Sequence, residues 1–186
     1  MLSFSERNMD KTYNEKFKNL VLYVLSHEDY KEGGIKKLNK LLYFIDFYFY
    51  RDNERLISNV DYAKADMGPI VDGYKLIFNE LAEDGVLKQV SNVGYVAYKP
   101  NQEPNLGDFS SDEIAHIGRV LDQYGKLSGS DLESISHQQQ PWVLTESIGE
   151  KIDPDLALLI ADNGSEEVDV QNQDLKKELI DLANSV

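Results

Sequence analysis

Residues 36–57, KKLNKLLYFIDFYFYRDNERLI, carry apolar side chains around almost the whole circumference of a predicted helix. One stripe recurs at helical spacing and consists of Leu38, Leu41, Leu42, Ile45 and Phe49. The aromatic residues off this stripe are Tyr43, Phe44, Phe47, Tyr48 and Tyr50. A helix that is apolar all round is buried among other elements. The sequence therefore predicts that this helix lies at the centre of a helical domain.

Local signals on both sides of this helix predict two neighbouring helices. Thr12 and Glu15 have the spacing of a capping box, which predicts the start of an amphipathic helix. Gly68 and Pro69 predict the start of another helix, which continues to about residue 84, because proline suits the first helical position.

The second half of the chain predicts a hairpin and further helices. Its composition becomes rich in β-forming residues around a short turn, which predicts strands near 86–90 and 94–98. Two capping boxes then predict helices. Their pairs are Ser110 with Glu113 and Ser130 with Glu133. The predicted fold class is mainly α (α+β), a helical domain around a central hydrophobic helix, with a small β-hairpin that forms a winged-helix-like element.

Composition excludes several classes of site and of location. The chain contains no cysteine, which rules out disulfides, thiolate zinc sites and cysteine nucleophiles. It shows neither a basic start followed by an apolar run nor an apolar stretch near the roughly 20 residues that span a bilayer. We therefore expect a cytoplasmic protein that does not enter membranes.

Residue patterns for catalysis or metal binding are not found. The histidines His27, His116 and His137 are far apart in sequence, without the close spacing of metal ligands on one helix. We expect His116 at an exposed or boundary position and His137 in a structural hydrogen bond. Nucleophile elbows, phosphate loops and dinucleotide fingerprints are also missing from the sequence. We expect no catalytic, cofactor or metal site, and hence no enzyme.

Charge weighs against the main alternative, a winged-helix transcriptional regulator of a phage or mobile element that binds DNA. The formal net charge is −14, and residues 61–186 hold 24 Asp and Glu against nine Lys and Arg. The helix expected from Pro69 to Asp84 resembles a recognition helix in its order before the hairpin, but it carries Lys75 as its one cation. Since Lys and Arg supply most affinity for phosphates, DNA binding is disfavoured. A basic protein partner, or a negative charge that serves solubility alone, fits better.

Three blocks of sequence together resemble the Panacea domain of bacterial and phage antitoxins, the SocA-like antitoxin domain. They are KLNKLLYFIDFYFY, DMGPIVDGYKLIFNEL and FSSDEIAHIGRVLDQYGKLSGSDLESISHQQQPW, in the order of the family. The likeness covers about Lys36 to Trp142. The sequence departs from the family pattern at Ile70, where valine is usual, and at Met67, where an aromatic residue is usual.

The resemblance implies an antitoxin that neutralises a cognate protein toxin, encoded by an adjacent gene, through direct contact and without catalysis. The family motif residues, carried over by position and expected to hold the fold, are Lys40, Leu41, Leu42, Tyr43, Gly68, Pro69, Tyr74, His137, Pro141 and Trp142. We expect the antitoxin domain to span residues 1–150. Residues 151–186 are expected to form a helical tail, and the hypothesis for this tail is that it tunes the choice of partner.

The aromatic surplus of the central helix suggests a place for the toxin. Tyr43, Phe47 and Tyr50 lie on one side of the helix at spacings of four and three residues, with Asp46 nearby. Aromatic residues are enriched at the centres of protein interfaces. The hypothesis is that these four residues form an exposed toxin-binding patch, and the alternative is that they all belong to the core.

Overall fold

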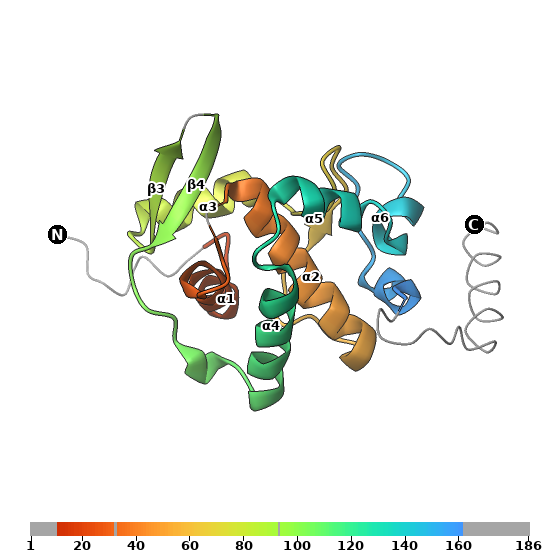
Figure 1. Ribbon diagram of the computed structural model, residues 1–186, viewed down its shortest axis with the longest axis horizontal. Coiled ribbons are helices and arrows are strands. Elements are labelled where there is room, and N and C mark those ends of the chain that lie inside the picture. Colours follow the sequence, from red (N-terminus) through yellow and green to blue (C-terminus); the bar gives the residue numbers. More distant parts are fainter. Residues whose placement is uncertain (1–10, 32, 93, 162–186) are drawn as a thin grey trace.

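The long helix α2 (Ile35–Asn53) runs through the middle of the fold, with α1 (Glu15–Ser26) beside it (Figure 1). The computed structural model describes residues 11–31, 33–92 and 94–161. Every residue of α2 from Lys37 to Phe49 is buried. The prediction of a central hydrophobic helix is therefore confirmed.

Different flanks of α2 pack against different neighbours, which explains its apolar circumference. Phe44 and Tyr48 stack toward Tyr124 of α4 (Ser111–Tyr124), and the hydroxyl groups of Tyr48 and Tyr124 lie 3.1 Å apart. On another flank, the rings of Tyr43 and Phe47 lie 4.4 Å apart. Aromatic pairs at such distances add packing energy beyond that of the buried area.

A helix and a hairpin cover one end of α2. α3 (Tyr74–Glu83) leads into β3 (Leu87–Asn92), which pairs antiparallel with β4 (Tyr95–Pro100). The ring of Phe78 on α3 stacks on that of Tyr98 on β4 at 5.5 Å, so the hairpin is fixed to the helix. The predicted order of helix and hairpin is confirmed, and so is the mainly α fold class.

Short elements complete the other end. After η2 (Leu106–Asp108) and α4, the chain forms α5 (Gly129–Ser136), α6 (Gln140–Leu144) and η3 (Pro154–Leu159). η3 packs against both α2 and α6, and it buries Ala157 and Leu159. The packed part of the chain thus continues past residue 150, where the predicted domain ends. The helix expected near the C-terminus lies outside the described residues.

Among the predicted helix starts, the capping box of Ser110 and Glu113 forms as expected. Three other starts differ from the prediction. α1 instead takes Asn14 as its N-cap, because the backbone of Thr12 donates to Glu80. The cap of α5 is Ser128, two residues before the predicted one.

The third difference concerns the segment after Gly68 and Pro69, which forms a strand rather than a helix. β2 (Ile70–Val71) pairs with β1 (Tyr62–Ala63), and α3 begins only at Tyr74. The backbone N–H of Val71 donates to the Asn39 side chain on α2 at 2.8 Å. Contacts with α2 therefore hold this segment extended and override the local helix signal.

Candidate functional site

The predicted toxin-binding patch does not lie on the surface of this structure. Tyr43, Asp46 and Phe47 are each 0% exposed, and only Tyr50 is partly exposed. The rings of Tyr43 and Phe47 both contact that of Tyr62, with centroids 5.9 and 5.5 Å away. The exposed patch is corrected to an interior position for these three residues, because β1 covers this flank of α2.

Asp46 acts as a buried acceptor that joins α2 to the chain after it. Its carboxylate accepts hydrogen bonds from the backbone of Ile57 at 2.8 Å, the backbone of Ser58 at 2.9 Å and the hydroxyl of Tyr62 at 2.7 Å. The Ser58 hydroxyl is a further donor. Burial raises the pKa of Asp46, and these donors oppose that rise by stabilising the charged form. A single carboxylate thereby fixes the path from α2 into β1.

Family motif residues from three parts of the sequence meet where the loop between β1 and β2 touches α2 and α5. The Lys40 side chain is 0% exposed, and its Nζ donates to the Pro69 carbonyl at 2.6 Å. Gly68 has φ +87° and lies so close to its neighbours that a Cβ there would be 2.5 Å from Ser136 Oγ and 2.8 Å from Lys40 Cε. We call residues 64–69 the β1–β2 loop.

The indole of Trp142 binds the same loop from α6. Its Nε1 donates to the Ala65 carbonyl at 3.1 Å, and its ring stacks on that of His137 at 4.0 Å. For His137 the structure shows stacking rather than the expected hydrogen bond, since its buried Nε2 has no partner among the described residues. The ammonium group of Lys64 lies 4.5 Å from the centre of the Trp142 ring. The motif residues Trp142 and His137 thus contact the β1–β2 loop from the side of α6.

The other motif residues lie apart from this contact. Leu41 and Leu42 are fully buried core residues, and Pro141 is buried at the start of α6. Tyr74 begins α3 and packs against the core. Sequence reasoning identified these residues individually but missed that Lys40, Gly68 and Trp142 converge on one loop, because their distances in sequence give no sign of it.

Lys40 is the most perturbed group in this cluster. Burial lowers the pKa of Lys40 from 10.5 to about 7, while the charge of Glu133 opposes the shift. Among the described residues, its ammonium group donates to a neutral carbonyl, that of Pro69. The protonated amine is therefore poorly compensated in the folded protein.

Lys40→Met is expected to remove a pH-dependent part of the stability. Between pH 7 and 9 the unfolded chain holds this proton and the folded chain loses it, so the wild type gains up to about 1.4 kcal/mol of unfolding free energy per pH unit relative to the variant. Urea unfolding at pH 7, 8 and 9 measures the difference. Lys88→Met, at an exposed position of β3, is the control that keeps the wild-type dependence. Parallel curves for wild type and Lys40→Met would contradict the assignment.

The helix considered for DNA recognition is partly covered. The backbone and hydroxyl of Thr12 donate to Glu80 of α3, and Lys11 lies 3.1 Å from Asp84 at its end. The hydroxyl of Tyr13 also donates to Asp84. An acidic helix that carries the N-terminal segment is a poor surface for a phosphate backbone.

The described residues contain neither a cluster of metal ligands nor a helix that could cross a membrane. Within 11–31, 33–92 and 94–161, the structure contains no group of three or more His, Asp or Glu side chains placed to hold a metal ion. Among these same residues, no helix has the length and apolar character needed to cross a bilayer.

His116, expected near the surface, is buried, and its Nε2 lies 2.9 Å from the Ile45 carbonyl.

The comparison with protein families decides the relationship of the chain. The family model described as antitoxin SocA-like, Panacea domain, matches residues 38–143, which is more than half of the sequence. The chain belongs to the SocA-like Panacea antitoxin family. No curated protein and no solved structure matched the sequence.

The matched Panacea region runs from α2 to α6 and so contains the whole motif cluster. Within it, motif side chains donate to backbone carbonyls of the β1–β2 loop. These contacts place the side chains of Lys40 and Trp142 against the backbone of that loop. Membership of this family suggests that the protein acts in a toxin–antitoxin system and has a toxin as its partner. It also suggests a regulator rather than an enzyme.

Proposed function

We propose that this protein is a cytoplasmic antitoxin that neutralises a cognate protein toxin, encoded by an adjacent gene, by binding it directly. The observation that carries the proposal is the match of the Panacea family over residues 38–143. The motif residues Lys40 and Trp142 support the absence of a catalytic role for them, since they direct their polar groups to backbone atoms of the same chain.

Charge supports a basic partner. The net charge of −14 favours association with a positively charged protein surface and opposes binding to nucleic acid. The acidic residues of α3 that engage residues 11–13 weigh in the same direction. For residues 151–186 we propose that the part beyond the packed η3 segment tunes the choice of toxin.

Co-expression with the neighbouring open reading frame tests the proposal. Bacteria that induce this frame alone are expected to stop growing, and bacteria that also express the present protein are expected to survive. The two proteins are then expected to elute together in size-exclusion chromatography. A neighbour that is harmless, or that kills despite the protein, would refute the antitoxin function for this pair.

Measurement of affinity for duplex DNA at low salt separates the antitoxin from the regulator. The antitoxin is expected to show no retardation of DNA in a gel, whereas a winged-helix regulator binds most tightly when salt is low. A shift that disappears as salt is raised would favour the regulator.

A further inference from the structure

We propose that the β1–β2 loop, α6 and the segment after α6 form one surface that binds a basic, apolar face of the cognate toxin. This inference rests on the proposed function and adds the place and chemistry of the contact. We call it the Met67 surface, and it is defined by Asp66, Met67, Val143, Glu146 and Ile148.

Three large apolar side chains are exposed at this end of the fold. Met67 is 58% exposed in the β1–β2 loop, Val143 is 48% exposed on α6, and Ile148 is 55% exposed in the segment that follows. Exposed apolar residues are common when single, but a group on adjoining segments is typical of an interaction site.

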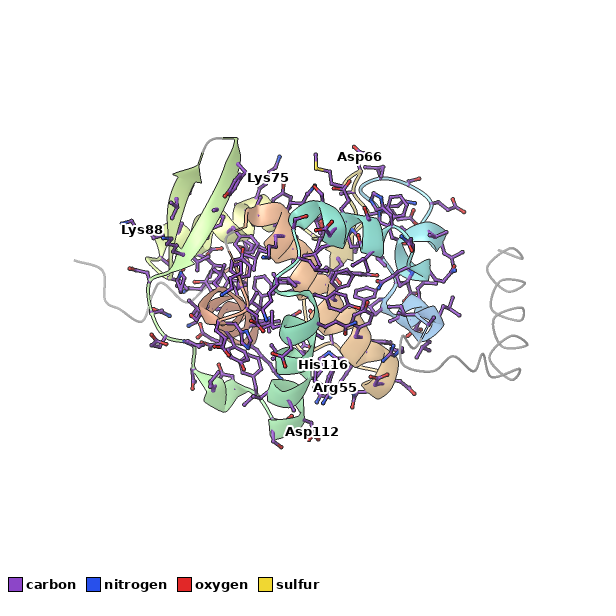
Figure 2. All side chains as sticks on the ribbon, viewed as in Figure 1. Arg55, Asp66, Lys75, Lys88, Asp112 and His116 are labelled. Atoms are coloured by element: carbon purple, nitrogen blue, oxygen red, sulfur yellow. The ribbon has the colours of Figure 1, made fainter. Side chains whose placement is uncertain are left out.

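Hydrogen bonds join the three segments. The backbone N–H of Lys64 donates to the Glu150 carbonyl at 2.9 Å, and the N–H of Gly149 donates to the Lys64 carbonyl at 2.8 Å. Trp142 ties α6 to Ala65. Figure 2 shows Asp66 at the outer end of the β1–β2 loop, next to the segment that follows α6.

Contacts of the motif residues Lys40 and Gly68 restrain the inner side of the β1–β2 loop. Gly68 takes a left-handed conformation against Ser136, and the Pro69 carbonyl is fixed by Lys40. A surface that is already ordered loses less conformational entropy on binding, which favours affinity. The inner contacts of the loop thus favour binding at its exposed side, because fewer conformations are lost there.

The charge of this surface selects a basic partner. Residues 61–72 and 141–151 hold the carboxylates Asp61, Asp66, Asp72, Glu146 and Glu150 against the two lysines Lys64 and Lys151. Lys64 is directed to the Trp142 ring and the Thr145 carbonyl, and Lys151 is paired with Asp61. The carboxylates of Asp66 and Glu146 are exposed.

A second pair of exposed apolar residues lies near the hairpin, apart from the Met67 surface. Leu76 on α3 and Val96 on β4 are 63% and 40% exposed. The lysines near them include Lys75 and Lys88, which Figure 2 shows on the hairpin side, away from Asp66. These two positions are a suitable control because they are exposed and apolar but lie on other segments than the Met67 surface.

Paired lysine substitutions test the proposal. Met67→Lys with Ile148→Lys is expected to weaken binding to the product of the neighbouring open reading frame at least about tenfold, and to abolish rescue of growth. Leu76→Lys with Val96→Lys, at two exposed apolar positions near the hairpin, is expected to keep both the binding and the rescue. Isothermal titration calorimetry gives the affinities, and thermal unfolding checks that both variants fold.

The charge is tested separately. Asp66→Lys with Glu146→Lys is expected to slow association and weaken binding about tenfold at low salt, with a smaller loss at high salt. Glu103→Lys with Asp122→Lys changes the net charge equally at exposed positions elsewhere. An equal loss in both pairs would overturn the local charge complementarity and leave only attraction by net charge.

The outcomes separate the surface from the function. Wild-type rescue and binding, combined with unchanged affinity of the folded Met67→Lys, Ile148→Lys variant, would overturn the Met67 surface and leave the antitoxin function intact. Failure of the wild type to bind would overturn the function, and the surface proposal would fall with it. A photo-crosslinking residue at position 67 is expected to capture the toxin, and the same residue at position 76 is not.

Discussion

Asp46→Ala is expected to lower the free energy of unfolding by about 3–5 kcal/mol, which is the range for removing one partner from a buried charged network. The substitution leaves the buried backbone N–H groups of Ile57 and Ser58 without their acceptor. The Tyr62 hydroxyl also loses its partner. Urea unfolding followed by circular dichroism measures the change.

Asp46→Asn is the matched control for shape. Its amide oxygen can accept from the two backbone N–H groups, and its NH₂ can donate to the hydroxyls of Ser58 and Tyr62, since a hydroxyl both donates and accepts. We expect a loss of about 1 kcal/mol. A loss under about 1 kcal/mol for the alanine variant would show that Asp46 does not hold this junction.

The titration of Asp46 gives the control a further readout. Burial raises the pKa of this carboxyl, so the folded state holds its proton to a higher pH than the unfolded state. The wild type therefore loses stability as pH rises from the ordinary value of 3.8 through the raised folded value. Asp46→Asn lacks this loss, and its stability relative to the wild type is expected to increase over the same interval.

Gly68→Ala is expected to destabilise the protein by about 3 kcal/mol, through backbone strain and steric overlap together. The positive φ of +87° is unfavourable for any residue with a Cβ, and the new atom would overlap Ser136 Oγ at 2.5 Å. The same Cβ would also lie 2.8 Å from Lys40 Cε, so it could not move away from Ser136 without meeting Lys40. Thermal and urea unfolding report the loss.

Gly73→Ala isolates the backbone part of this effect. Gly73 also has a positive φ, of +67°, but a Cβ there would meet nothing within 4 Å. We expect this control to lose only about 1 kcal/mol. Adding Ser136→Ala to Gly68→Ala is expected to recover part of the difference. Equal losses at positions 68 and 73 would show that the close packing contributes nothing.

The sequence predicts the centre of this fold because periodic apolar residues report burial directly. The apolar residues of α2 and the β-rich segment before Pro100 each carry a strong local pattern. The buried helix and the hairpin both form as expected. The pattern does not tell which neighbour covers which flank, so Phe47 was open to both interpretations. Asp46 within the aromatic run gave no sign that this flank is internal, because carboxylates are rarely buried and its donors come from residues 57–62.

The parts that sequence reasoning missed depend on contacts between distant residues. Gly68 and Pro69 have the local character of a helix start, but Lys40 holds the Pro69 carbonyl and β1 pairs with the residues that follow. The proposed Met67 surface was not predicted either, because it joins residues about 80 positions apart. The departure of Met67 from the family pattern was the one local signal at that surface.

The inward orientation of the motif has a use in protein engineering. Lys40, Gly68 and Trp142 direct their contacts to the interior and to backbone atoms, so the features by which the family is recognised leave the outer side chains free to change. On the proposal that the Met67 surface binds the toxin, a library that randomises Asp66, Met67 and Ile148 is expected to sample new specificities while the interior stays unchanged. Selection of such a library against unrelated toxins offers a route to antitoxins with chosen specificity.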